Sequence, residues 1–594
     1  MSDHRSAVTE QLNLGLACQQ AGRLDAAEAN YRAILRQAPQ CAEAWLNLGR
    51  IAQDRNGRES AKKYFLRALE IEPDHYEACY LLGEIFRLGG DYGPAVEYLA
   101  RARDRDPRRS EPFRQLGMAF KALGDFDSAV DCFRQALQRR PDDPVVLANL
   151  GIICQATDRR EEAVKYYCSA LELRLDFPQV LGNLGGIYRE LGRYAEGLEC
   201  TTRALVADPE NTVYLNNHGN LLLKLNRLAE AQTVLEQALA VDPHGRTTLL
   251  NLAAVCLARH DPDQAGYYLR IILSAQPDDV DANWSLALVA LFAGRLAEGF
   301  RLYDWRWRKN DFRNIRRDYT QPRWDGATQP GKTILIWAEQ GFGDTIQFCR
   351  FVPGLHRYFG RVVLKVPNPL RGLLETLAGV DLLCTSDGSA PDFDYHLPLL
   401  SLPQFFIAND RPVAREIPYL AVPEGRSVTP SLAAADPSRP RIGICWAGNP
   451  DHENDHNRST HLRDWKPLLE SDRFRFFSLQ KGPQSAELAE ADAGSNIVDI
   501  AGSLGDFADT AAAIGELDLV ITVDSAVAHL AGALGQPVWI LLAYQSDWRW
   551  QYDREDSYWY PTARLFRQVA DCRWDAVLEQ VAEELLTEFP RDVQ

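Results

Sequence analysis

Two short segments of this chain carry residues that could take part in group transfer, and each follows an apolar run. The first is Gly341-Phe342-Gly343-Asp344, and the second is Asp524-Ser525-Ala526 with His529 one helical turn later. Glycines between a strand and a helix let a substrate approach the backbone, and a helix N-terminus favours an anion. We expect Asp344 to face a ligand site and residues 524–529 to form a cradle for a diphosphate.

Each of these residues also has a structural interpretation. Aspartate at the start of a helix is a good N-cap, which would account for Asp344 without any chemistry. A single histidine usually packs in a core, so Ser525 and His529 could be a cap and a buried side chain. Spacing alone leaves both interpretations open.

Two basic residues follow other apolar runs and could balance the charge of a diphosphate. Lys481 comes directly after the run at 474–480, and Arg458 lies in the loop that follows the run at 441–448. A solvated surface lysine is the alternative for Lys481. We therefore treat Lys481 and Arg458 as candidate donor-binding residues.

The elements that must position these residues alternate between short apolar runs and helical segments from Thr333 onward. This alternation predicts parallel sheets covered by helices, arranged as two doubly wound lobes with a ligand at the carboxyl ends of the strands. We expect a first lobe at 332–425 and a second at 440–594, whose closing helix could cross back to the first lobe. The Pro-, Ser- and Ala-rich stretch 422–439 would be the hinge. The predicted strands are 334–337, 362–366 and 381–384 in the first lobe, and 441–448, 474–480, 496–501, 517–524 and 537–543 in the second.

The first half of the chain has a period of 34 residues. Prolines recur at this interval, and Leu175 occupies the one position of the row that lacks a proline. Small residues recur at two other positions of each period. This pattern is typical of tetratricopeptide (TPR) helix pairs, which stack into an α-solenoid with a continuous core. We expect the solenoid at 8–309 and a linker at 310–331. The prolines of the row are Pro39, Pro73, Pro107, Pro141, Pro209, Pro243 and Pro277.

A row of asparagines follows the same period, on the first helix of each pair. An amide is both donor and acceptor, so such a row could hold the backbone of an extended peptide. The alternative is that each amide bonds to a neighbouring repeat. The residues are Asn47, Asn149, Asn183, Asn217 and Asn251.

Composition excludes several classes of function. A net charge of −17 argues against nucleic acid as the main partner. Twelve scattered cysteines without a C-x-x-C pair indicate free thiols in a reducing compartment, and no apolar run reaches the roughly 18 residues of a membrane helix. We expect a cytoplasmic protein without a transmembrane segment. The P-loop-like match at 326–333 precedes a predicted strand instead of following one, so we reject it.

The two chemistry-bearing segments together resemble glycosyltransferase family 9, the heptosyltransferase-like enzymes with a GT-B fold, over roughly 332–570. The repeats resemble those of O-linked N-acetylglucosamine transferases. The resemblance implies that Asp344 is the base and that the segment 524–529 holds the nucleotide of the donor. This chain departs from the family in its long loop at 449–461 and in lacking an evident lysine–glutamate pair for the nucleotide sugar.

These expectations combine into an inverting, metal-independent glycosyltransferase. A nucleotide-diphosphate sugar would be the co-substrate, with no cofactor, and the TPR groove would supply a protein or peptide acceptor. Two alternatives stay open. The chain could be a non-catalytic TPR adaptor with a degenerate transferase domain, or a heptosyltransferase-like enzyme that acts on a cell-envelope glycan.

Overall fold

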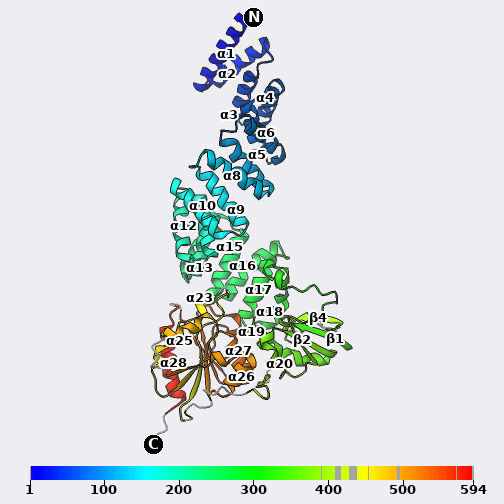
Figure 1. The fold of residues 1–594 in the computed structure, drawn as a ribbon, viewed down its shortest axis with the longest axis vertical. Coiled ribbons are helices and arrows are strands. Elements are labelled where there is room, and N and C mark those ends of the chain that lie inside the picture. Colours follow the sequence, from blue (N-terminus) through cyan, green and yellow to red (C-terminus); the bar gives the residue numbers. More distant parts are fainter. Residues whose placement is uncertain are drawn as a thin grey trace. The chain divides into compact units, whose positions relative to one another are not determined.

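The computed structural model divides the chain into two compact units, Met1–Leu225 and Asn226–Gln594 (Figure 1). Within the described part of the chain, no helix is both long and apolar enough to cross a membrane. Only the backbone is described at 2–7, 311, 313, 314 and 490. The described residues are 2–388, 391–407, 417–426, 432, 436, 438–452, 454–490, 496–569 and 572–590.

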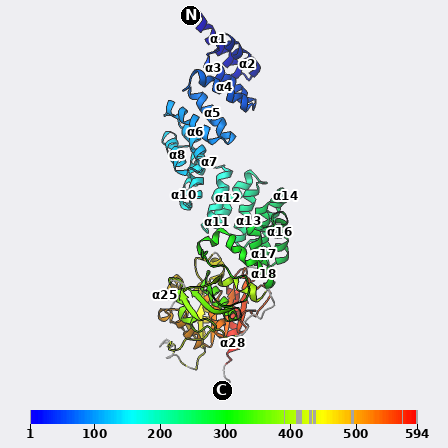
Figure 2. The same ribbon diagram turned by 90° about the vertical axis from the view of Figure 1, so that its right-hand side faces the viewer.

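The first unit is a stack of antiparallel helix pairs (Figure 2). Each proline of its row stands two residues after a second helix ends, where it cannot extend the hydrogen-bond ladder. The predicted TPR solenoid is confirmed for these repeats. The helices are α1 (Ser2–Gln20), α2 (Leu24–Gln37), α3 (Ala42–Asp54), α4 (Arg58–Ile71), α5 (Tyr76–Gly89), α6 (Tyr92–Arg105), α7 (Glu111–Leu123), α8 (Phe126–Arg139), α9 (Pro144–Ala156), α10 (Arg160–Leu173), α11 (Pro178–Glu190), α12 (Tyr194–Ala207) and α13 (Thr212–Lys224).

The small residue in the first helix of a pair makes room for a side chain of the second helix, which is an aromatic ring in several pairs. A Cβ added at Gly49 would lie 2.3 Å from Cε1 of Phe65, and one at Gly151 would lie 2.5 Å from Cε1 of Tyr167. Both rings are fully buried. The glycine therefore lets the two helices approach closely, because a larger residue would overlap with the ring.

The second unit begins with further helices of the repeat and continues into two short 3-10 helices. The helices are α14 (Leu228–Val241), α15 (Arg246–Ala258), α16 (Pro262–Ala275), α17 (Val280–Phe292) and α18 (Leu296–Leu302), followed by η1 (Tyr303–Arg308) and η2 (Asn310–Ile315).

Two parallel sheets form the rest of the second unit, as the alternation of strand and helix predicts (Figure 1). The first has the order β3-β2-β1-β4 and the second β10-β9-β8-β5-β6-β7, with every pairing parallel. The strands are β1 (Gln329–Trp337), β2 (Phe359–Val366), β3 (Leu382–Thr385), β4 (Tyr395–Pro398), β5 (Arg441–Cys445), β6 (Arg475–Ser478), β7 (Ile497–Asp499), β8 (Leu519–Val523), β9 (Val538–Leu542) and β10 (Ala563–Arg567).

Each of the eight predicted apolar runs overlaps with a strand, whereas β4 and β10 were not predicted. Both are edge strands, and their sequences YHLP and ARLFR mix polar with apolar residues. These two strands therefore lack the apolar run that reveals a buried parallel strand, whereas the edge strands β3 and β7 have one. Strand β1 also begins inside the segment that the sequence assigned to a linker.

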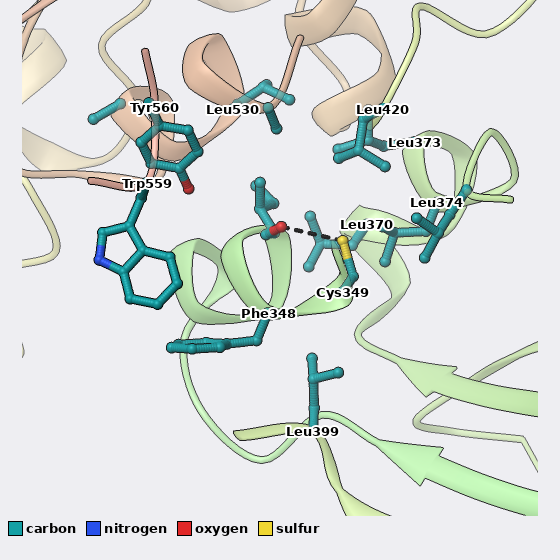
Figure 3. Close-up of a cluster of buried hydrophobic side chains, with 14 of the residues drawn as sticks. Phe348, Cys349, Leu370, Leu373, Leu374, Leu399, Leu420, Leu530, Trp559 and Tyr560 are labelled. Atoms are coloured by element: carbon teal, nitrogen blue, oxygen red, sulfur yellow. Dashed lines mark hydrogen bonds between the residues drawn. The ribbon is translucent and has the colours of Figure 1, made fainter. Parts of the chain in front are cut away.

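The two lobes share a buried apolar core. Helix α19 (Phe342–Phe348) of the first lobe packs on α27 (Ala526–Leu534) of the second, and Figure 3 shows Phe348 near Trp559 and Cys349 beside Leu370. The thiol of Cys349 donates to the carbonyl oxygen of Ile346 at 3.1 Å. The starts of α19 and α27 are therefore held together by packing beneath them.

The closing helix α28 (Asp575–Glu588) covers the second lobe and does not cross back to the first. Its apolar face packs against Trp465 and Phe474, so that expectation was wrong. Four buried residues at near-helical spacing, Val577, Leu578, Val581 and Leu585, all face this core. Much of the expected hinge, including 427–431, 433–435 and 437, lies outside the described residues.

Candidate functional site

The two predicted chemistry-bearing segments meet in the structure. Asp344 lies in α19, which follows β1, and Asp524 directly follows β8. A Cβ added at Gly343 would lie 2.7 Å from Cδ2 of His529 and 3.5 Å from Cα of Ala526. Glycine at this position therefore permits direct contact between the two lobes, whereas the sequence suggested that it makes room for a substrate.

Asp344 is a largely buried carboxylate with two partners. Its Oδ2 accepts from the backbone N–H of Gly341 at 3.1 Å, and its Oδ1 accepts from Nη2 of Arg549. The structure places Gly341 at the N-cap and Asp344 at the third helical position, so the cap interpretation holds only in this modified form. Burial raises the pKa of Asp344, the guanidinium of Arg549 opposes that shift, and the charge of Asp547 adds to it.

Arg549 is the main residue of this site that sequence reasoning did not assign. Its Nε donates to Oε1 of Gln347 at 2.7 Å, and its Nη1 donates to Oδ1 of Asp547 at 2.8 Å. The guanidinium also lies 4.4 Å from the ring centroid of Trp548, and the residue is 8% exposed. The sequence DWRW at 547–550 is conspicuous, but only the tertiary structure shows that its arginine contacts Asp344, 205 positions away in the chain.

Asp524 lies in the second lobe, between β8 and the N-cap residue of α27. Its pKa is raised to about 6, mainly by burial and also by the charge of Asp547, while the charge of Arg458 acts in the opposite direction. The hydroxyl of Ser525, the N-cap residue of α27, lies 3.0 Å from Oγ1 of Thr522. The cradle residues are thus gathered beside a carboxyl group that titrates near neutral pH.

His529 is buried beneath the site. Its Nδ1 lies 2.9 Å from the hydroxyl oxygen of Tyr560, and its ring stacks on Trp550 with a centroid distance of 5.3 Å. Burial, together with the nearby arginine charges, lowers the pKa of His529 well below its usual value. This environment favours a packed, neutral histidine over a phosphate ligand.

The two basic candidates differ in their environments. The ammonium of Lys481 donates to the carbonyl oxygens of Ala501, at 3.1 Å, and Leu504, so it binds the adjacent loop. Arg458 donates from Nε to Oδ1 of Asp455 at 3.2 Å and remains close enough to lower the pKa of Asp524. The structure thus brings Arg458 to the site and gives Lys481 a local structural contact.

The asparagines of the repeats bond within the solenoid. The Oδ1 of Asn149 accepts from Lys121 at 2.6 Å, and its Nδ2 donates to the carbonyl oxygen of Val145 at 2.8 Å. Asn217 donates to the carbonyl oxygen of Gly182 at 3.3 Å. In the same way, Asn47 accepts from Arg50 and Asn183 donates to the hydroxyl of Tyr167, each at 3.5 Å. Asn251 is not free either. These bonds favour the alternative in which the amides hold the solenoid together.

A second buried pair lies directly after β1. Glu339 accepts from Nη2 of Arg306 at 2.8 Å and from the backbone N–H groups of Leu399 and Leu400 at 3.0 and 3.1 Å. Both charged side chains are fully buried, and burial raises the pKa of Glu339 to about 7. The pair joins η1 to the strand end that leads to Asp344. The sequence showed both residues but no spacing that links them.

The rejected P-loop match has no role in this site. Its last residues lie within β1, where Nζ of Lys332 donates to Oδ1 of Asp394 at 2.8 Å. The other carboxylate oxygen of Asp394 accepts from the backbone N–H of Thr333 at 2.8 Å. Among the described residues, no group of three or more His, Cys, Asp or Glu side chains is arranged to hold a metal ion.

Three family models match the chain. Glycosyltransferase family 9 (heptosyltransferase) matches residues 469–559, and a tetratricopeptide repeat matches 216–279. The C-terminal domain of cilia and flagella-associated protein 70 matches 9–242. The chain combines tetratricopeptide repeats with a glycosyltransferase family 9 domain. The family 9 match includes Asp524 and Arg549 but neither Asp344 nor Arg458, so it is shorter than the resemblance seen in the sequence.

A curated relative is the protein FlbA of Caulobacter vibrioides, which is 27% identical over 342 residues. The match covers 52% of this chain and 56% of FlbA, so the chain spans about half the length of this relative.

Among solved structures, the chain is similar to the protein MamA, with 24% identity and a TM-score of 0.26 over 27% of this chain and 93% of that chain. It is also similar to PilF of Pseudomonas aeruginosa, with 20% identity and a TM-score of 0.32 over 35% and 94% of the two chains. A third is YrrB, described as a TPR protein with an unusual peptide-binding site, with 17% identity and a TM-score of 0.30 over 34% and 100%.

Proposed function

We propose that this chain is an inverting glycosyltransferase that moves a sugar from a nucleotide-diphosphate donor to an acceptor hydroxyl. The observation that carries the proposal is the buried pair of Asp344 and Arg549 beside the start of α27. It places a carboxylate and a guanidinium where the strand ends of two doubly wound lobes meet, which is where such folds bind ligands. The family 9 match to the second lobe supports the same reaction class.

In the proposed reaction, the carboxylate of Asp344 takes the proton of the acceptor hydroxyl. The hydroxyl oxygen forms a bond to the anomeric carbon, and the bond between that carbon and the diphosphate oxygen breaks. The nucleoside diphosphate leaves with the electron pair of the broken bond. Burial strengthens Asp344 as a base because it raises the pKa, although the contact with Arg549 must loosen for the proton to be accepted.

The donor would lie against residues 524–526, with its diphosphate at the N-terminus of α27 and beside Arg458. Two guanidinium groups, those of Arg458 and Arg549, can balance the charge of the leaving diphosphate, so we propose that the reaction needs neither metal nor cofactor. His529 and Lys481 would support the site from beneath, because their polar atoms already have partners.

We propose that the acceptor is a protein segment bound by the repeats. TPR repeats suggest protein–protein interaction, which supports a protein acceptor in preference to a glycan. The asparagine row supplies no further support, because its amides bond within the solenoid. The evidence for a protein acceptor is therefore independent of the evidence for the transfer reaction.

One alternative has specific support. The ion pair of Asp344 and the buried position of His529 are both consistent with a domain that has kept its fold but no longer binds a sugar-nucleotide donor. Such a chain would act as a TPR adaptor. It would bind no sugar nucleotide and would tolerate Asp344→Asn without loss of function.

Calorimetric titration of UDP, GDP and ADP into the full chain, first without and then with a divalent metal, separates these functions. We expect micromolar binding of one nucleotide without metal, weakened about tenfold or more by Arg458→Gln through loss of a charge-assisted contact. Arg463→Gln is the matched control, because that side chain is 81% exposed. If none of the three nucleotides gives a binding signal with a folded sample, the result would support the adaptor function.

A further inference from the structure

In each repeat, one residue of the turn between the two helices has a left-handed backbone conformation. The φ angle of this residue lies between 57° and 85°, a region that favours glycine most and asparagine and aspartate after it. His260 is the one residue of another type. The row, at intervals of 34, is Gly22, Asn56, Gly90, Gly124, Asp158, Gly192, Asn226, His260 and Gly294.

The last three positions of this row differ from the earlier ones in what surrounds them. A Cβ added at the four glycines of the first unit would meet no described atom within 4 Å, whereas one at Gly294 would lie 2.9 Å from Nε2 of Gln551. Gln551 belongs to the segment 544–552, which also carries Asp547 and Arg549. The last three turns therefore face the segment that supplies the arginine of the site.

His260 contacts both ends of this segment. Its ring centroid lies 4.4 Å from that of Tyr544 and 5.3 Å from that of Tyr552. Its Nε2 lies 2.9 Å from the backbone carbonyl oxygen of Tyr544, so the ring donates a hydrogen bond there. The histidine thus binds both ends of the segment, which explains why a larger residue occupies a turn that glycine would suit.

Asn226 joins the same segment to the loop that carries Arg458. Its Nδ2 donates to Oδ1 of Asn457 at 2.9 Å, and its Oδ1 accepts from Nε2 of Gln545. Asn457 precedes Arg458 in the short helix α23 (Asp455–Arg458). One turn residue therefore connects the two segments that hold the two arginines of the proposed site.

We propose that Asn226, His260 and Gly294 are positioning residues, through which the last repeat turns hold Arg549 and Arg458 in place. The turns touch the segments that carry these arginines, and neither turn residue with a side chain contacts Asp344 or Asp524 in the described structure. The effect on donor binding rests on the proposed function, whereas the ordering of 544–552 by the turns does not.

Amide hydrogen exchange of the full chain tests this proposal. His260→Gly removes the ring and keeps a backbone suited to the left-handed turn, and Asn56→Gly is the same change in the first unit. We expect His260→Gly to speed exchange in 544–552 about tenfold, from the loss of ring stacking and one hydrogen bond. Exchange in α15 should stay unchanged, which shows that the repeat itself remains folded. Asn56→Gly should leave 544–552 unaffected.

Equal exchange in 544–552 for the wild type and His260→Gly would overturn the proposal. Titration with UDP, GDP and ADP then separates it from the proposed function. If exchange rises and a nucleotide binds about tenfold more weakly to His260→Gly than to Asn56→Gly, the positioning role extends to the donor. If exchange rises and the wild type binds no nucleotide, the turns still order the segment, while the glycosyltransferase proposal fails.

Discussion

The repeats of the first unit and the transferase lobes of the second are stabilised by contacts of different range. In the first unit, Gly49 packs against Phe65, 16 positions along the chain, and the same interval joins Gly151 to Tyr167. In the lobes, the buried pair of Asp344 and Arg549 joins residues 205 positions apart.

This difference determines what a single substitution does. A repeat contact is apolar, local and duplicated along the chain, so its loss is partly confined to one pair of helices. A buried ion pair between lobes has no duplicate, and removal of one partner leaves a charge without compensation. We therefore expect substitutions in the lobes to have the larger effects.

Arg549→Leu should have the largest effect, lowering the free energy of unfolding of the second unit by about 3–5 kcal/mol because Asp344 is left buried and unpaired. Urea unfolding followed by tryptophan fluorescence measures it, since twelve of the 13 tryptophans lie in that unit. Arg193→Leu, which breaks an exposed pair with Glu196, is the control and should cause no measurable change. An equally small effect of Arg549→Leu would show that the pair is not a structural link between the lobes.

Glu339 should make the stability of the second unit depend on pH. Its pKa is about 7 in the folded chain and near 4.5 when exposed, so the folded state keeps a proton that the unfolded state has lost between these values. The free energy of unfolding should therefore fall as pH rises from about 4.5 to 7, by up to about 3 kcal/mol. Glu339→Gln should reduce this slope in urea unfolding at pH 5 to 8 and leave the part that Asp524 contributes, since its pKa is also raised, to about 6. An unchanged slope in the variant would assign the effect to another group.

Gly49→Ala should destabilise one repeat by about 1–3 kcal/mol, because the new Cβ overlaps with the ring of Phe65. Amide exchange in α3 and α4 should rise, with little change in α11 and α12. Gly93→Ala is the matched control, since a Cβ at that helical position meets no described atom within 4 Å. Faster exchange over the whole first unit would mean that its repeats unfold as one block.

Leu175→Pro should have the smallest effect, and it should be stabilising by about 0.4–1 kcal/mol. Leu175 stands in the vacant slot of the proline row, and the residue before it, Arg174, has φ −142° and ψ 94°. These angles match those of Arg140, φ −140° and ψ 92°, which precedes Pro141. Exchange in α10 and the melting temperature measure the change. Destabilisation would show that this fifth slot differs from the others in a way that the backbone angles of Arg174 do not reveal.

The fold was largely predictable, because its signals are periodic or continuous. The 34-residue rows of proline and small residues predicted the helix pairs, and eight apolar runs predicted eight strands. Strands β4 and β10 were not predicted because their sequences mix polar with apolar residues. The lobe on which α28 packs was not predicted either, since an amphipathic pattern shows that one face of a helix is buried but not which core it packs against.

The candidate site was predictable only in part. Asp344, Asp524 and Arg458 follow strands, and parallel strand ends share an edge, so their convergence could be expected. The environments of His529 and Lys481 could not, because a sequence does not show which polar atoms already have partners. Arg549 carried no spacing signal, since its partner lies in the other lobe.

The sequence by itself determined the repeat period, the parallel strands and the two segments that meet at the site. These depend on residue types at short, regular intervals, where backbone geometry decides the outcome. Only the tertiary structure decided that Arg549 pairs with Asp344, that His529 is buried and that His260 holds the segment 544–552. Each of these depends on burial and on contacts between segments far apart in the chain, which no local interval encodes.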